Sequence, residues 1–272
     1  MRATGIPYSL LVLVGCLLVS DRLVHAHTDH MSLGRTADGR LTWHPTNGVA
    51  NHALTPLAAI PPGGPLEGFS ATIPGFGDAV QSEPDVDVHP LAVGANVWLE
   101  IVRIDDALLM IETPSFVIIN LLPTPEMRLG AQAMHNHPIW LIDTDDPAYD
   151  PSRCVWEVTF VLKDKGMTQY ADSELITLRF SRDAVPAAAD FDCDGDVDDD
   201  DYEVFQNCAT GAEVPYDIDA LATGCDVFAS HTGIIPPDLD ADGDVDQSDF
   251  GVFQRCISGE NIAADPACGE GG

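Results

Sequence analysis

Apolar and polar residues alternate along several short segments between residues 27 and 183. Within 154–163, Glu157 and Thr159 fall on one face of an extended backbone, whereas Trp156 and Phe160 fall on the other. A period of two residues is typical of β-strands that bury one face. The other segments that the pattern predicts as strands are 97–104, 108–111, 116–122, 139–142 and 175–180.

Turn residues separate these short segments. Ala37-Asp38-Gly39-Arg40 carries the Asp-Gly signal of a β-hairpin. No stretch of 27–183 shows a long helical period, so we expect an antiparallel β-sandwich or jelly roll. Residues 45–95 are rich in Pro, Gly and Ala, and we expect them to form long loops across it.

The pattern changes at residue 190, where two acidic segments repeat each other. Residues 190–201 read DFDCDGDVDDDD and residues 238–249 read DLDADGDVDQSD. The match continues at the same offset through aromatic, glutamine, cysteine and glycine residues. Similarity over about twenty residues indicates an internal duplication. The matched pairs after the acidic segments are Tyr202/Phe250, Val204/Val252, Phe205/Phe253, Gln206/Gln254, Cys208/Cys256 and Gly211/Gly259.

The spacing of the acids in each copy is that of an EF-hand-type calcium loop. Such a loop presents oxygens from positions 1, 3, 5, 7, 9 and 12, and position 7 uses its backbone carbonyl. Gly195 and Gly243 stand at position 6, where the chain must turn sharply. We therefore predict two calcium ions, and we expect Val197 and Val245 at position 8 to pair across the loops. The predicted calcium-binding residues are Asp190, Asp192, Asp194, Asp196, Asp198, Asp201, Asp238, Asp240, Asp242, Asp244, Asp246 and Asp249.

Each loop is expected to lead into a helix that begins at position 12. In that helix Tyr202 and Phe205, like Phe250 and Phe253 in the second copy, give an apolar face. Proline precedes both loops and blocks an entering helix. A duplicated loop and exit helix without entering helices resembles the type I dockerin, over residues 190–259.

The dockerin resemblance implies a fold and a partner. In that family two loop-helix units pack with near two-fold symmetry around two calcium ions, and many members plug into cohesin domains of a scaffold. It implies a protein partner here, either cohesin-like or part of the cell envelope. Cellulosomal dockerins commonly carry a Ser/Thr-type pair at positions 10 and 11, where this chain has Asp199-Asp200 and Gln247-Ser248. Dockerin-like pairs of non-cellulosomal secreted bacterial proteins are therefore the better match.

Charge supports the metal and excludes one class of partner. The formal net charge is −32, and residues 190–249 contain no Lys or Arg. A strongly acidic segment repels nucleic acid, so we exclude that partner. Without the regular spacing, the same composition would be typical of a disordered tail.

The first residues predict export. Arg2 precedes an apolar run at 10–19 that is too short to span a bilayer, and residues 24–26 fit a cleavage site. Residues 1–26 are therefore a predicted signal peptide, and no later stretch is long enough for a membrane helix. The expected location is extracellular or periplasmic. The alternative is a lipoprotein anchored through Cys16, because residues 13–16 resemble a lipobox.

Six cysteines remain after residue 26, and an even number in an exported chain predicts disulfides. Pairing cysteines that are close in the sequence would join Cys208 to Cys225 and Cys256 to Cys268. Cys154 and Cys193 would then pair across the linker or stay free. The expected organisation is a β-rich domain at 27–183, a linker at 184–189 and the calcium module at 190–272.

Histidines give the β-rich domain its one unusual chemistry. His135-Asn-His137 on a strand would place both imidazoles on one face, which suits zinc, copper or iron. His27 and His30 are further candidate ligands, and an N-terminal His27 would also suit a copper histidine brace. The alternative interpretation is that all of them are ordinary surface or loop histidines.

The sequence lacks the common catalytic motifs Gly-x-Ser-x-Gly and His-Glu-x-x-His, and it has no phosphate-binding glycine loop. The leading hypothesis is therefore a non-enzymatic β domain that a calcium module docks to a partner. The alternatives are a carbohydrate-active enzyme or polysaccharide-binding module with the same anchor, and transition-metal capture by the histidines. The acids available for glycoside cleavage are Glu100, Glu112, Glu126, Asp143 and Glu157.

Overall fold

The computed structural model describes residues 30–45, 54–61, 67–78, 87–131, 134–182 and 185–269. The predicted signal peptide, with Cys16, lies outside the described residues, as does His27. The strands are β1 His30–Arg35, β2 Leu41–Pro45, β3 Leu54–Ala59, β4 Gly68–Ala71, β5 Gly75–Asp78, β6 Val97–Ile104, β7 Leu108–Ile111, β8 Glu126–Gly130, β9 His135–Asn136, β10 Ile139–Asp143, β11 Val155–Asp164 and β12 Ile176–Arg182. The helices are the 3-10 helix η2 Ile119–Leu121 and the α-helices α1 Asp199–Cys208 and α2 Gln247–Cys256.

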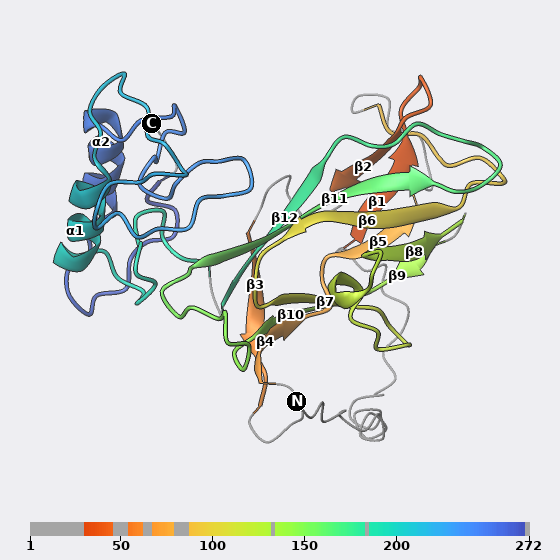
Figure 1. Ribbon diagram of the computed structural model, residues 1–272, viewed down its shortest axis with the longest axis horizontal. Helices are drawn as coiled ribbons and strands as arrows, with labels where there is room; N and C mark the ends of the chain where they lie inside the picture. Colours follow the sequence, from red (N-terminus) through yellow and green to blue (C-terminus); the bar gives the residue numbers. More distant parts are fainter. Residues whose placement is uncertain are drawn as a thin grey trace, which may run out of the picture.

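The strands form two sheets, which confirms a β-rich domain. A four-stranded sheet has the order β2-β1-β5-β9, and an eight-stranded sheet has the order β7-β10-β4-β3-β12-β11-β6-β8 (Figure 1). Most neighbours are antiparallel, as predicted, but β1 pairs with β5 and β12 pairs with β3 in parallel. The sheets are therefore mixed, because connections longer than a hairpin bring these strands together.

The apolar faces of the two sheets share one core. Phe76 of β5 packs edge-on against Phe160 of β11, with 6.0 Å between ring centroids. Trp140 of β10 and Phe180 of β12 lie 4.9 Å apart in the same core. The alternating residues that the sequence assigns to a buried face are therefore buried, and the Ala37–Arg40 turn joins β1 to β2 as expected.

The apolar run at 116–122 is not a strand, contrary to the prediction. Phe116 has a positive φ of 56°, and only Ile118 forms a bridge, to Ile111. Asn120 instead serves the edge of β7: its Oδ1 accepts from the Met110 N–H at 3.1 Å, and its Nδ2 donates to the Leu108 carbonyl. A side-chain amide thus replaces the neighbouring strand.

The Pro-, Gly- and Ala-rich stretch at 45–95 is also more regular than predicted. It contains β3, β4 and β5, which lie inside the sheets rather than over them. These strands alternate poorly because glycine, proline and alanine separate their few large apolar residues. Backbone pairing with longer neighbours holds them in place, and that does not depend on the side-chain pattern.

The C-terminal residues form a small separate core around the two α-helices (Figure 1). The rings of Phe205 of α1 and Phe253 of α2 pack in a tilted arrangement with 5.5 Å between centroids, and Tyr202 and Phe250 complete the aromatic cluster. Both helices begin at loop position 10, two residues earlier than predicted, and no helix precedes either loop in 185–198 or 235–246. We call residues 185–269 the loop-helix module.

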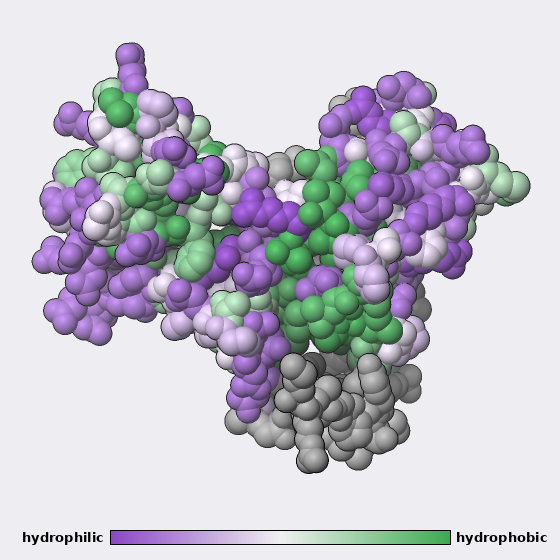
Figure 2. Space-filling view, viewed as in Figure 1, coloured by the Kyte–Doolittle hydropathy of each residue, from purple (hydrophilic) through white to green (hydrophobic). Residues whose placement is uncertain are grey.

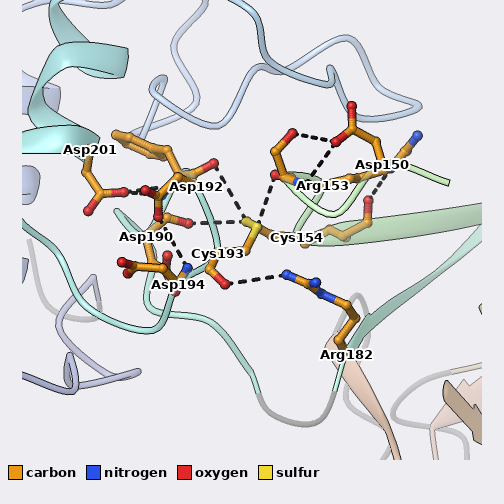
Figure 3. Close-up of a disulfide and its surroundings, with 12 residues drawn as sticks. Asp150, Arg153, Cys154, Arg182, Asp190, Asp192, Cys193, Asp194 and Asp201 are labelled. Atoms are coloured by element: carbon orange, nitrogen blue, oxygen red, sulfur yellow. Dashed lines mark hydrogen bonds between the residues drawn. A yellow bond between two sulfur atoms is a disulfide. The ribbon is translucent and has the colours of Figure 1, made fainter. Parts of the chain in front are cut away.

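Three disulfides connect the described chain. Cys208–Cys225 and Cys256–Cys268 confirm the predicted local pairs, and the third joins Cys154 to Cys193. Figure 3 shows this third bond between the start of β11 and the first acidic loop, where Arg182 also donates to the Cys193 carbonyl at 3.4 Å. The module is therefore covalently attached to the eight-stranded sheet.

The surface differs between the two parts. Hydrophilic residues surround the outer edge of the module, whereas hydrophobic residues gather on the face of the sheet near η2 (Figure 2). In and beside η2, the apolar side chains of Phe116, Leu121 and Leu122 are exposed. None of the described helices is long and apolar enough to cross a bilayer.

Candidate metal centre

Each acidic loop ends in the same capping arrangement. The Asp198 side chain at position 9 caps α1 by accepting from the Asp200 N–H at 2.8 Å, and Asp201 accepts from the Asp198 N–H at 2.9 Å. Asp246 and Asp249 repeat this reciprocal capping box at the start of α2. Such a box fixes the angle at which the loop enters its helix.

The aspartate at position 12 also fastens the end of each loop to its beginning. Asp201 Oδ1 accepts from the Phe191 N–H at 2.6 Å, and Asp249 Oδ1 accepts from the equivalent Leu239 N–H at 2.7 Å. Both carboxylates are almost completely buried. A side chain shorter than glutamate therefore draws the helix close to the loop, and positions 1 and 12 come together.

The turns inside the loops have the same backbone conformation in both copies. Gly195 and Gly243 at position 6 have φ values of 98° and 99°, which side-chain-bearing residues rarely adopt. Cys193 and Ala241 at position 4 have φ values of 66° and 61°. Each loop therefore passes twice through the left-handed backbone region, at positions 4 and 6.

Eleven of the twelve predicted residues fall into convergent groups, and the two groups of the second loop share Asp249. The groups, in which ligand atoms lie within 4.8 Å of one another, are Asp190/Asp192/Asp194, Asp196/Asp198/Asp201, Asp238/Asp240/Asp249 and Asp244/Asp246/Asp249. Asp242 is outside these groups, and its Oδ1 accepts from the Asp244 N–H at 3.2 Å. The structure therefore brings together all the predicted residues except Asp242.

The two copies are joined crosswise. The Val197 carbonyl accepts from the Ser258 and Gly259 N–H groups, and the Val245 carbonyl accepts from the N–H groups of Thr210 and Gly211. Both valine side chains are buried in the shared core. The expected pairing of one valine with the other is wrong for the backbone, because each valine pairs with the residues that follow the other copy's helix.

The carboxylates fit a bound calcium ion. Among the described residues, Asp190 Oδ1, Asp196 Oδ1 and Asp244 Oδ1 are buried without a hydrogen-bond partner. A buried, unpaired carboxylate oxygen is strongly unfavourable unless a cation neutralises it. Hard oxygen ligands in this number are those that calcium prefers. A bound ion would supply the positive charge that residues 190–249 lack.

Comparison with protein-family models, curated proteins and solved structures finds no match to this chain.

The pKa values of two loop carboxyls predict how the metal-free module responds to pH. Burial, and then neighbouring carboxylates, raise the pKa of Asp190 to about 6 and that of Asp201 to about 7, from an ordinary 3.8. A raised carboxyl pKa gives stability that is complete below pH 3.8 and is lost as the pH rises through 6 to 7. In calcium-free buffer we therefore expect helical ellipticity at 222 nm to increase as the pH is lowered from neutral to about 5.

Calcium-loaded protein should show the opposite trend, because protons compete with the ion for the same carboxylates. Calcium affinity measured by calorimetry is expected to fall across the same pH window. If helical ellipticity in calcium-free buffer instead declined steadily below neutral pH, the loop carboxyls would not control folding.

Three of the four candidate histidines of the β domain are described, and they lie together. His30 opens β1, whereas His135 and His137 come from β9 and the residue after it. Their ring centroids are 4.6 to 4.9 Å apart. Among the acids considered for glycoside cleavage, Glu100, Glu126 and Glu157 pair with Lys163, Lys165 and Arg179 respectively.

His231 binds the module to the sheet, a role that no sequence motif predicted. Its Nδ1 bonds Thr159 Oγ1 at 2.7 Å, its Nε2 bonds Asp105 Oδ1 at 3.1 Å, and its N–H donates to Glu157 at 2.5 Å. The His231 side chain is only 3% exposed. The only feature of the sequence that could have drawn attention to His231 is that it is an isolated histidine in a segment without Lys or Arg.

Proposed function

We propose that this chain is an exported calcium-binding protein. Two calcium ions fold its C-terminal part into a dockerin-like module, which docks a β-sandwich domain to a protein partner. The observation that carries the proposal is the duplicated loop, whose buried carboxylates converge in both copies and leave three oxygens unpaired. Disulfides fit an oxidising, extracellular or periplasmic location.

Calcium is favoured over other ions by ligand type. All grouped ligands in the loops are carboxylates, with no histidine or cysteine thiolate among them, since Cys193 is in a disulfide. Magnesium demands strict octahedral geometry and keeps its water, whereas calcium accepts crowded, irregular oxygen shells. Loops that present acids at five or more positions therefore suit calcium.

A protein partner is supported by the surface of the module and by its resemblance to dockerins. Besides its acidic groups, the module exposes Ile257 and Ile262 after α2, and Val214 and Ile218 between the repeats. Apolar side chains set among charges are typical of protein interfaces. A cohesin-like domain or an envelope protein would be the partner.

Calorimetry on the chain without residues 1–26 tests the calcium assignment. We expect uptake of two calcium ions per chain in the metal-free protein. Asp249→Asn, which removes a charge shared by both groups of the second loop, should reduce uptake to one ion. The matched control is Asp199→Asn at loop position 10, which is exposed and outside the groups, and it should retain both ions.

The same measurement separates the alternatives. A chain that takes up no calcium contradicts the assignment altogether. Equal losses in Asp199→Asn and Asp249→Asn would mean that calcium responds to overall negative charge rather than to the loop geometry.

A further inference from the structure

The histidine group of the β domain has a defined place in the four-stranded sheet. His30 of β1 lies opposite Gly75 of β5, and His135 of β9 lies opposite Gly77 of the same strand. Residues two apart on a strand share a face, so Gly75 and Gly77 leave a bare strip on one face of β5. The imidazoles approach one another over this strip.

The glycines provide the space that the rings need. A Cβ atom at Gly75 would lie 2.6 Å from His137 Nδ1, and a Cβ atom at Gly77 would lie 3.7 Å from the His30 ring. Glycine inside a strand usually marks a close approach by another group. Any larger residue at position 75 would displace the His137 ring.

Hydrogen bonds orient His137 with its Nε2 toward His30. His137 Nδ1 lies 3.0 Å from the Thr72 carbonyl, which can only accept, so Nδ1 carries the hydrogen. The Nε2 lone pair of a neutral His137 then faces His30 Nε2, at 2.9 Å. Fixing the tautomer through the other ring nitrogen is how metal-binding histidines are usually oriented.

The spacing of the ring nitrogens suits a first-row metal. Two nitrogens bound to one tetrahedral zinc ion at about 2.0 Å are roughly 3.3 Å apart, only slightly more than the observed separation of His30 and His137 Nε2. One ligand atom from each of the three histidines lies within 4.8 Å of the others. In the metal-free site, the hydrogen between the two Nε2 atoms belongs to His30. Metal binding at His30 Nε2 would displace this hydrogen, and a neutral His30 would then carry it on Nδ1.

From this geometry we infer that His30, His135 and His137 form a binding site for a divalent transition-metal ion, with zinc the best match. Imidazole nitrogen is a ligand for zinc, copper, nickel and iron but not for calcium. Three neutral ligands leave the ion its full positive charge, in a chain of strongly negative net charge. The site is separate from the acidic loops and takes a different class of metal.

The test titrates the chain without residues 1–26 with Zn²⁺ by calorimetry, after metal removal and in excess calcium that fills the acidic loops. We expect one zinc ion per chain. His137→Gln and the exposed His135→Gln should each weaken zinc binding by more than the roughly 10–100-fold that loss of a second-shell partner costs. Gly75→Ala keeps all three imidazoles and should also weaken binding, because its Cβ takes the place of the His137 ring.

The matched control is His89→Gln, a histidine that bridges to Arg35 at the opposite end of β1 and should leave zinc uptake unchanged. Tryptophan fluorescence checks that each variant is folded, since Trp140 and Trp156 lie in the core of the β domain. Absence of stoichiometric zinc uptake, or uptake that persists in both His135→Gln and His137→Gln, overturns the site. Asp249→Asn should bind zinc normally, so failure of the calcium loops is distinguishable from failure of this site.

Discussion

Removal of calcium with EDTA at neutral pH is expected to unfold the loop-helix module and to leave the β domain folded. Both described α-helices belong to the module, so ellipticity at 222 nm should fall. The part of the near-ultraviolet tyrosine and phenylalanine signal that comes from the aromatic cluster of the module should be lost with it, whereas the part from the β-domain core should remain. All four tryptophans precede residue 185, so their bands and fluorescence should persist.

The expected size of this effect follows from the crowding of like charges. Carboxylates about 4 Å apart repel one another by roughly 1–4 kcal/mol per pair, depending on the local dielectric. Several such pairs meet in each loop, and the module has only a small aromatic core to oppose them. Added calcium attracts every carboxylate of a loop and so outweighs their mutual repulsion. It should therefore restore the spectrum.

A magnesium salt at the same ionic strength is the control for simple screening of charge. It should restore much less of the spectrum, because magnesium fits the loops poorly. An unchanged spectrum in EDTA would show that the module folds without metal.

Asp105→Ala is expected to destabilise the β domain by about 3–5 kcal/mol, because it removes the buried partner of the mostly buried Arg153, whose side chain is 12% exposed. Asp105 pairs with Arg153, accepts from the Glu157 N–H at 2.7 Å and bonds His231. Burial alone would raise the pKa of Asp105, but the hydrogen bond from His231 and the charge of Arg153 outweigh it and hold the pKa below its ordinary value. The carboxylate is therefore ionised at neutral pH.

Urea unfolding followed by tryptophan fluorescence measures this loss. Asp106→Ala is the matched control, since it removes an adjacent but exposed carboxylate and should change stability by less than about 0.5 kcal/mol. His231→Ala should cost about 1–3 kcal/mol, because it leaves buried polar atoms on the sheet unsatisfied. Equal stability of Asp105→Ala and Asp106→Ala would show that the buried cluster does not hold the structure together.

Periodicity predicted the strands that carry large alternating side chains, and it failed where other forces set the backbone. Residues 97–104 and 108–111 coincide with β6 and β7. The run at 116–122 looked like a strand because its residues are apolar, but Asn120 supplies the hydrogen bonds instead. Alternation placed Glu157 and Thr159 on the face opposite Trp156 and Phe160. Both are also buried, beneath the segment around His231, which lies far away in the sequence.

The grouping of the loop carboxylates was predictable because a local motif contains each set within twelve residues. Their convergence depends on short-range turns, which Gly195 and Gly243 permit. The histidine group was predictable only in part. His135 and His137 share a strand face by spacing alone, but the approach of His30 depends on the parallel pairing of β1 with β5, which no local pattern reveals.

The disulfide at Cys193 makes the two copies of the duplication unequal. Cys193 occupies position 4 of the first loop and is bonded to the β domain, whereas Ala241 occupies that position in the second. A cross-link reduces the number of open conformations that a loop can explore before a ligand arrives. The first loop therefore loses less conformational entropy on closing, and near-identical sequences in one module need not have identical affinities.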